Sequence, residues 1–327
     1  MKSRPLTCIT AIMLFATLAI PIGFAAQEQQ QQEPKKEHAR YKLIDLGTFG
    51  GPSSYINVYT GTGFSQQDLN NHRMEVGSAD TSTPDPFAPN CFNADCFVSH
   101  TFLWQKGVST DMGALPGGGS SLAAWISATG LIAGESQNGV IDPILGIPEF
   151  NAVLWSGGEI MNLGTLGGTL SAAFAVNNGE QVVGGALNSL PDPVCFESCA
   201  EQARAFLWHN GLMHDLGTLG GPDAEALFIN ERGQVSGWAF TNATRNPVTG
   251  IPTQDPFLWE SGRILDLGTL GGTVGFPNGL NNRGQVIGVS NLAGDLTSHP
   301  FLWTKSKGMQ DLGTFGGSNG QAISELL

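Results

Sequence analysis

The sequence predicts an all-β fold, a β-propeller built from four-stranded blades. Three short motifs recur in a fixed order from Tyr41 onward, and glycine is abundant, with 45 copies in 327 residues. Beyond the N-terminus, no segment carries the sustained apolar period of a helix. Short strands and tight turns that repeat about every 50 residues match the size of one propeller blade.

The first residues indicate an export signal. A short basic head precedes an almost uncharged apolar run from Ile9 to Phe24, and small residues follow it. We predict a signal peptide over residues 1–25, cleaved after Ala25 or Ala26. A membrane anchor is the alternative, although the run is barely long enough to cross a bilayer and no second stretch approaches its length.

A glutamine-rich segment over residues 26–40 follows the signal. It cannot bury enough apolar surface to order itself, so we predict a disordered tether. The formal charge of −13 becomes −15 once Lys2 and Arg4 leave with the signal. Because no Lys/Arg cluster follows the tether, nucleic acid is excluded as a partner, and we interpret the acidity as solubility.

Three linked motifs define the repeat. DLGTLGG and its variants occur six times, at intervals of 45 to 66 residues. An FLW motif precedes five of the copies and ends in Trp104, Trp155, Trp208, Trp259 and Trp303. An Asn-x-x-Gly-x-Val-x-Gly stretch follows each Gly-Gly and predicts a tight hairpin, since Asn and Gly tolerate positive φ. Each unit is thus predicted as four strands: FLW, DLG, the Asn strand and V-x-G.

We predict one propeller over residues 41–327, with five blades. The FLW strand from Phe301 to Trp303 would complete the blade that begins at Tyr41 and so close the ring. A ring of six blades is the main alternative. An open solenoid is the third, disfavoured because neither end shows a polar cap.

A longer period of 104 residues separates Trp104 from Trp208 and Cys91 from Cys195, which indicates duplication of a two-unit block. Four insertions share one slot, between the V-x-G strand and the next FLW strand. They run from about Ser78 to His100, Glu135 to Asn151, Ala186 to Arg204 and Phe240 to Asp255. Equivalent slots of a closed array lie on one side, so we predict that this face binds a ligand.

Four cysteines remain after the signal, in two close pairs. We predict disulfides between Cys91 and Cys96 and between Cys195 and Cys199, because an even number of cysteines in an exported chain favours pairing. Zinc is the alternative. No histidine cluster flanks either pair, so we predict no metal site.

Together, DLGTLGG, the Asn-x-x-Gly-x-Val-x-Gly stretch and the H-x-F-L-W element resemble the HAF repeat, a probable extracellular repeat of bacterial exported proteins. The resemblance covers Asp45 to Leu327. The His-Ala-Phe signature is degenerate here, as in His100-Thr-Phe and Asp255-Pro-Phe. The resemblance implies export and a propeller-like repeat architecture, and it implies no established activity.

Two recurring side chains have a functional and a structural interpretation. The Asp of DLG, replaced by Asn162 in one copy, either forms a ring of carboxylates or accepts backbone hydrogen bonds in a turn, and we favour the turn. The FLW tryptophans either stack on sugars or pack between blades, and we favour packing. Trp125 and Trp238 depart from the repeat pattern, so we predict them as ligand-contacting residues.

No catalytic motif is recognisable, so we predict that the chain is not an enzyme and needs no cofactor. The predicted function is a secreted module that binds an extracellular protein or carbohydrate through its loops, with no membrane span after signal cleavage. A structural or adhesive surface protein is one alternative. A propeller hydrolase is the other, and it would need acid residues clustered in a central channel.

Overall fold

The computed structural model describes residues 43–56, 67–89, 91–143, 146–194 and 201–322. Every regular element in these ranges is a β-strand, which confirms the all-β prediction. The predicted signal peptide and tether lie outside the described residues. Contacts divide the chain between Ile44 and Asp45, and all the strands belong to the second unit. Within the described ranges, no helix is long and apolar enough to cross a membrane.

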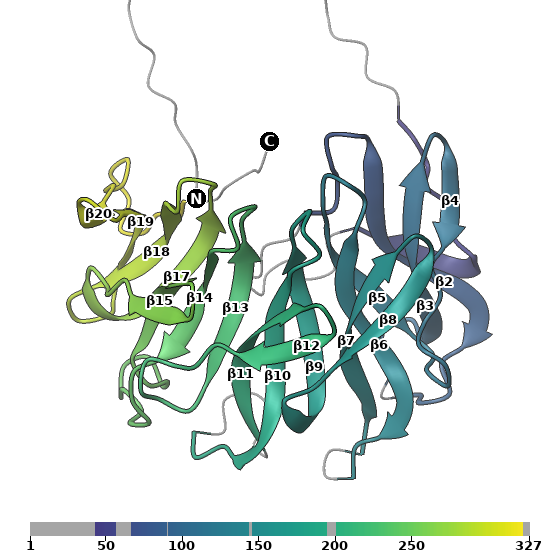
Figure 1. The fold of residues 1–327 in the computed structure, drawn as a ribbon, viewed down its shortest axis with the longest axis horizontal. Coiled ribbons are helices and arrows are strands. Elements are labelled where there is room, and N and C mark those ends of the chain that lie inside the picture. The colour runs from purple at the N-terminus through teal and green to yellow at the C-terminus, as the bar shows by residue number, and fades with distance from the viewer. Residues whose placement is uncertain (1–42, 57–66, 90, 144–145, 195–200, 323–327) are drawn as a thin grey trace, which may run out of the picture. The chain divides into compact units, whose positions relative to one another are not determined.

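The strands form consecutive antiparallel four-stranded sheets, which we call meanders 1 to 5 (Figure 1). Meander 1 contains β1 (Gly50–Tyr55), β2 (Met74–Pro84), β3 (Phe97–Gln105) and β4 (Val108–Asp111). Meander 2 contains β5 (Ser121–Ile126), β6 (Ile132–Ile141), β7 (Pro148–Ser156) and β8 (Glu159–Gly164). Meander 3 contains β9 (Gly167–Val176), β10 (Val182–Pro191), β11 (Glu201–His209) and β12 (Leu212–Asp215).

The last two meanders are joined. Meander 4 contains β13 (Ala224–Ile229), β14 (Val235–Phe240), β15 (Gln254–Glu260) and β16 (Arg263–Asp266). Meander 5 contains β17 (Gly271–Leu280), β18 (Val286–Leu292), β19 (Ser298–Thr304) and β20 (Gly308–Asp311). One parallel pair, Gln254 with Val274, links β15 to β17 and makes the two meanders one eight-stranded sheet.

Each meander begins at or just after a Gly-Gly pair and ends in a DLG strand, two strands out of phase with the predicted unit. The prediction that Phe301 to Trp303 completes the first blade is wrong, because β19 pairs with β18 and β20. The FLW and DLG strands are joined by tight turns such as Lys106-Gly107, and such turns hold consecutive strands in one sheet. The FLW strand of meander 1 is therefore β3.

The meanders pack face to face in chain order, which is the arrangement of a β-propeller. Between meanders 1 and 2, Ile132 and Trp155 pack against Met74 and Val76. The Trp155 indole also donates a hydrogen bond across this contact to the carbonyl of Met112, at 3.0 Å. Among the described strands, the extensive contacts join each meander to its neighbour in the chain. Ring closure and the number of blades stay predictions.

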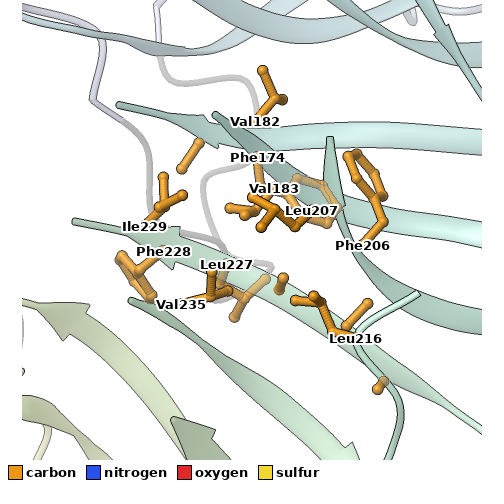
Figure 2. Close-up of a cluster of buried hydrophobic side chains, with 14 of the residues drawn as sticks. Phe174, Val182, Val183, Phe206, Leu207, Leu216, Leu227, Phe228, Ile229 and Val235 are labelled. Atoms are coloured by element: carbon orange, nitrogen blue, oxygen red, sulfur yellow. The ribbon is translucent and has the colours of Figure 1, made fainter. Parts of the chain in front are cut away.

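The FLW strands lie in the core, as predicted. Figure 2 shows the cluster around β10, β11 and β13, where Phe206 and Leu207 are both buried. The V-x-G glycine makes this packing fit: a Cβ on Gly184 would lie 1.9 Å from the carbonyl oxygen of Ala172 and 2.8 Å from the Phe206 ring. A side chain there would force backbone to move, so the glycine is needed for a close approach rather than for a turn.

The recurring asparagine of the third motif joins neighbouring meanders. Asn230 Oδ1 accepts hydrogen bonds from the N–H groups of Arg232 and Gln234, both at 3.0 Å, and closes its own hairpin. Its amide nitrogen donates to the carbonyl of Asn281 in the next meander, at 2.9 Å. Asn177 makes the equivalent bond to the Asn230 carbonyl, at 3.0 Å. The motif thus forms both a hairpin and a ladder between repeats.

The turn-capping interpretation of the DLG aspartate is also confirmed. Asp111 Oδ1 accepts a hydrogen bond from the N–H of Gly113 at 2.8 Å. Asn162 Oδ1 does the same for Gly164 at 2.8 Å, which explains why this copy tolerates the amide.

Candidate functional site

The predicted slot lies between the second and third strands of each meander. Much of each predicted insertion continues the strands, so the connecting loops are shorter than expected. We call the described parts of these connections the slot loops; they comprise residues 85–89, 91–96, 142–143, 146–147, 192–194, 241–253 and 293–297.

The slot loops of meanders 1 to 4 each contact the next repeat. Phe92 stacks on Phe150 with ring centroids 5.2 Å apart, and Thr169 Oγ1 donates a 2.6 Å hydrogen bond to Asp142. The Arg245 guanidinium donates to the Val194 carbonyl, and Asn246 Nδ2 donates to Asp295 at 3.0 Å. Two of these contacts, at Val194 and Asp295, join one slot loop to the next, and the other two join a slot loop to a strand of the next meander.

Aliphatic side chains are exposed on and beside the slot loops. They are Val140, Ile141, Ile147, Leu190, Val248 and Leu296, which come from the slot loops or the strand ends beside them in meanders 2 to 5. Leu190 is 56% exposed and Val248 is 58% exposed. Exposed apolar groups gathered on one surface are typical of sites where another protein binds.

A pair of carboxyl groups, one buried on β2 and one half-buried in the first slot loop, lies in meander 1. The predicted disulfide between Cys91 and Cys96 is present and closes the segment that carries Asp95. Asp80 on β2 is fully buried, accepts a hydrogen bond from the Ser53 N–H at 3.0 Å and another from the Ser99 hydroxyl. The Tyr55 hydroxyl donates to Asp95 Oδ2 at 2.6 Å.

The pKa values of these two carboxyl groups shift in opposite directions. Burial raises the pKa of Asp80, and its hydrogen bond to Asp95 raises it further. Burial also opposes ionisation of Asp95, but hydrogen bonds from Tyr55 and Asp80 outweigh that effect and lower the Asp95 pKa. One neutral and one charged carboxyl held side by side can donate and accept a proton at the same place.

Sequence reasoning missed this pair. Asp80 and Asp95 are separated by a loop and match no short motif, so only the fold brings them together. The usable signal was the disulfide, because a short closed segment rich in polar residues, CFNADC, holds its side chains in place.

A second acid pair occupies meander 1. When the repeats are aligned on the third motif, Asp68 takes the position of Trp125 and Phe228, and Glu75 takes the position of Ile132. These three counterparts are buried apolar residues. Burial raises the pKa of Asp68 to about 6. Burial, together with the charge of Asp68, raises the pKa of Glu75 to about 7. Groups with pKa values in this range can exchange protons near neutral pH.

Both tryptophans that were predicted to contact a ligand are buried. Trp125 is 5% exposed and packs edge to face on Phe228, with centroids 6.5 Å apart. Trp238 is 2% exposed, and its indole donates to Glu225 at 3.1 Å. Their departure from the repeat pattern reflects different core packing, since a large side chain in one repeat is accommodated by its neighbours.

The second cysteine pair, Cys195 and Cys199, lies outside the described residues. Within the described ranges, no group of three or more His, Cys, Asp and Glu side chains converges closely enough to hold a metal ion.

Comparison with solved structures finds similarity to β-propellers. The β-propeller domain of the Trilobed protease from Pyrococcus furiosus matches with 11% sequence identity and a TM-score of 0.41, over 67% of this chain and 60% of that one. Acylaminoacyl peptidase from Pyrococcus horikoshii matches with 15% identity and a TM-score of 0.40, over 74% and 36%. The chain therefore spans less than two thirds of either protein. No family model matches it, and no curated protein matches it.

The prediction that the chain is not an enzyme is contradicted by this comparison, because both propellers come from peptidases. That prediction depended on the absence of short catalytic motifs. Carboxyl groups that meet only in the fold, such as Asp80 and Asp95, leave no such motif. The likeness itself concerns the fold and assigns no activity to this chain.

Proposed function

We propose that this chain is an exported binding module whose slot loops form the contact surface for an extracellular protein. The observation that carries the proposal is the row of exposed aliphatic side chains on interlinked loops of successive repeats. Burying such groups against a partner releases about 25 cal/mol per Å² of apolar surface. The apolar N-terminal run and the resemblance to HAF repeats support export.

A protein fits this surface better than a carbohydrate does. Sugar rings are bound mainly by exposed aromatic faces. Of the two aromatic residues in the first slot loop, Phe92 is stacked on Phe150 and Phe87 is half-buried. The exposed groups are instead aliphatic, and aliphatic groups pack against the apolar core of a protein interface. Asp80 lies on β2 and Asp95 lies in the first slot loop, so this acid pair links the loop to the sheet.

The test is binding of the purified mature chain to defined panels of extracellular proteins and glycans. We expect saturable binding to a protein that is lost in the double variant Leu190→Asp/Val248→Asp. The matched control is Leu212→Asp on β12, since Leu212 is 61% exposed but lies away from the slot.

Three results would contradict the proposal. Equal binding by the slot variant and the control would remove the slot from the interface. Binding to a glycan alone would replace the partner class. Binding to neither panel would favour a structural or adhesive role.

A propeller hydrolase is the second candidate, favoured by Asp68 and Glu75. Their pKa values of about 6 and about 7 suit a general base and a general acid near neutral pH. Peptide and glycoside substrates should then be cleaved with a bell-shaped pH profile. Asp68→Asn should abolish that cleavage, and Asp45→Asn, which changes the charge equally, should not.

A further inference from the structure

In each meander, the first residue of DLG on the fourth strand faces a residue on the third strand. That residue lies two positions before the first residue of the FLW motif. Three of these pairs join a basic side chain to a carboxylate at 2.9 to 3.0 Å: His100 with Asp111, Arg204 with Asp215 and His299 with Asp311. In meander 2 both members are amides, and Asn162 Nδ2 donates to Asn151 Oδ1 at 3.3 Å. In these four meanders a hydrogen-bond donor therefore faces an acceptor.

Meander 4 breaks this rule, because Asp255 on β15 lies beside Asp266 on β16. Asp255 is 8% exposed, and its Oδ1 atom is buried with no hydrogen-bond partner. Burial raises the pKa of Asp255 to about 7, with the charge of Asp266 adding to the effect. A buried carboxyl oxygen without a partner is costly unless a proton or a cation neutralises it.

In the part of the chain that the structure describes, the one charge that acts on Asp255 is the negative charge of Asp266. The partner of Asp255 on β14 is Ala239, and the preceding residue, Gln254, pairs with Val274 on β17. In the equivalent place of meander 3, the Arg204 guanidinium also donates to the Pro222 carbonyl of the next meander, at 3.2 Å. The place therefore borders the next repeat. Its own ligands are the carboxyl oxygens of Asp255 and Asp266, and hard cations prefer such oxygen ligands.

We propose that Asp255 and Asp266 form a binding site for a hard divalent cation, for which Ca²⁺ is the probe. Asp255 supplies a buried carboxylate oxygen, and the exposed Asp266 is the side from which the ion enters. The ion takes the place that the arginine or histidine side chain has in meanders 1, 3 and 5. Because the ligands must lose their proton to bind, Ca²⁺ and protons compete for the site.

The experiment titrates Ca²⁺ into the EDTA-treated mature chain by calorimetry, and records thermal melts with and without Ca²⁺. We expect saturable binding near pH 8, weakened about ten-fold near pH 6, and a higher melting temperature with Ca²⁺. Asp255→His should abolish the binding. It reproduces the His–Asp pair that meanders 1 and 5 already contain, so it keeps a pairing compatible with this fold.

Two further variants separate the site from the general acidity of the chain. The double variant Asp255→Asn/Asp266→Asn reproduces the amide pair of meander 2 and should also lose binding. Asp215→Asn removes an acid that Arg204 already neutralises and should retain it. The same Ca²⁺ response in the wild type and both site variants would overturn the proposal. A melting temperature that depends on pH through Asp255 but not on Ca²⁺ would indicate a shared proton only, and would overturn it too.

Discussion

Replacing Asn230 by alanine tests whether the asparagine ladder holds the repeats together. The amide of Asn230 accepts two hydrogen bonds within its hairpin and donates one to the Asn281 carbonyl and one to Gln234 Oε1. Its side chain is 5% exposed, so water cannot replace the lost partners. Asn281 is the matched control, because it makes the same hairpin bonds and is exposed.

The two substitutions should differ in cost. Each hydrogen bond contributes about 1 kcal/mol net, and a buried group left without a partner costs about 1 to 3 kcal/mol. We expect Asn230→Ala to lower the free energy of unfolding by about 3 kcal/mol, and Asn281→Ala by about 1 kcal/mol. In a domain of this size 1 kcal/mol corresponds to about 2 °C, so the melting temperatures should fall by about 6 °C and about 2 °C.

Differential scanning calorimetry of the two variants and the wild type measures this difference. If Asn230→Ala melted within about 1 °C of Asn281→Ala, the bond between repeats would contribute nothing measurable, and the ladder would be a property of the hairpins alone.

Three further predictions follow from the packing and the charges. Gly237→Ala should destabilise by about 3 kcal/mol, since its Cβ would lie 1.9 Å from the Glu225 carbonyl oxygen, whereas Gly317→Ala, with 3.7 Å of clearance, should be nearly neutral in chemical denaturation. Loss of the Cys91–Cys96 disulfide should lower the free energy of unfolding by about 2 kcal/mol, from the entropy of the loop that it closes. Thermal melts of the Cys91→Ser/Cys96→Ser variant check this, and an unchanged melting temperature would mean that so short a loop does not restrain the unfolded chain. Native Asp255 keeps its proton to about pH 7, from a usual value of 3.8. A carboxyl pKa raised from 3.8 to about 7 corresponds to about 4 kcal/mol, and solvent screening at the exposed Asp266 reduces this to about 2 kcal/mol. Without Ca²⁺, the free energy of unfolding should therefore fall by about 2 kcal/mol from pH 4 to pH 7, and a flat profile in the wild type would refute the raised pKa.

Local patterns predicted most of the architecture. The recurring Gly, Asn and Asp positions each place a turn or a close approach, and such requirements act within a few residues. The all-β class, the hairpin at Asn230 and the turn at Asp111 followed from them. The phase of the repeat did not, because choosing which four strands form one sheet depends on pairing between segments, and both groupings have the same local motifs.

The site was less accessible to sequence reasoning. The slot and its Cys91–Cys96 disulfide were predicted, since insertions and cysteine spacing are visible in a single chain. The burial of Trp125 and Trp238 was not, because the exposure of a tryptophan depends on which side chains of other repeats surround it.

The repeat motifs alone were enough to predict four-stranded β units, their hairpins and the slot that carries the loops, because backbone conformation and apolar alternation are local properties. Burial and charge had to come from the folded chain. Asp80 and Asp95 come together only when β2 pairs with β3, and Asp255 and Asp266 only when β15 pairs with β16. The pKa of a carboxyl group depends on its distance from other charges and from water, and the fold sets both.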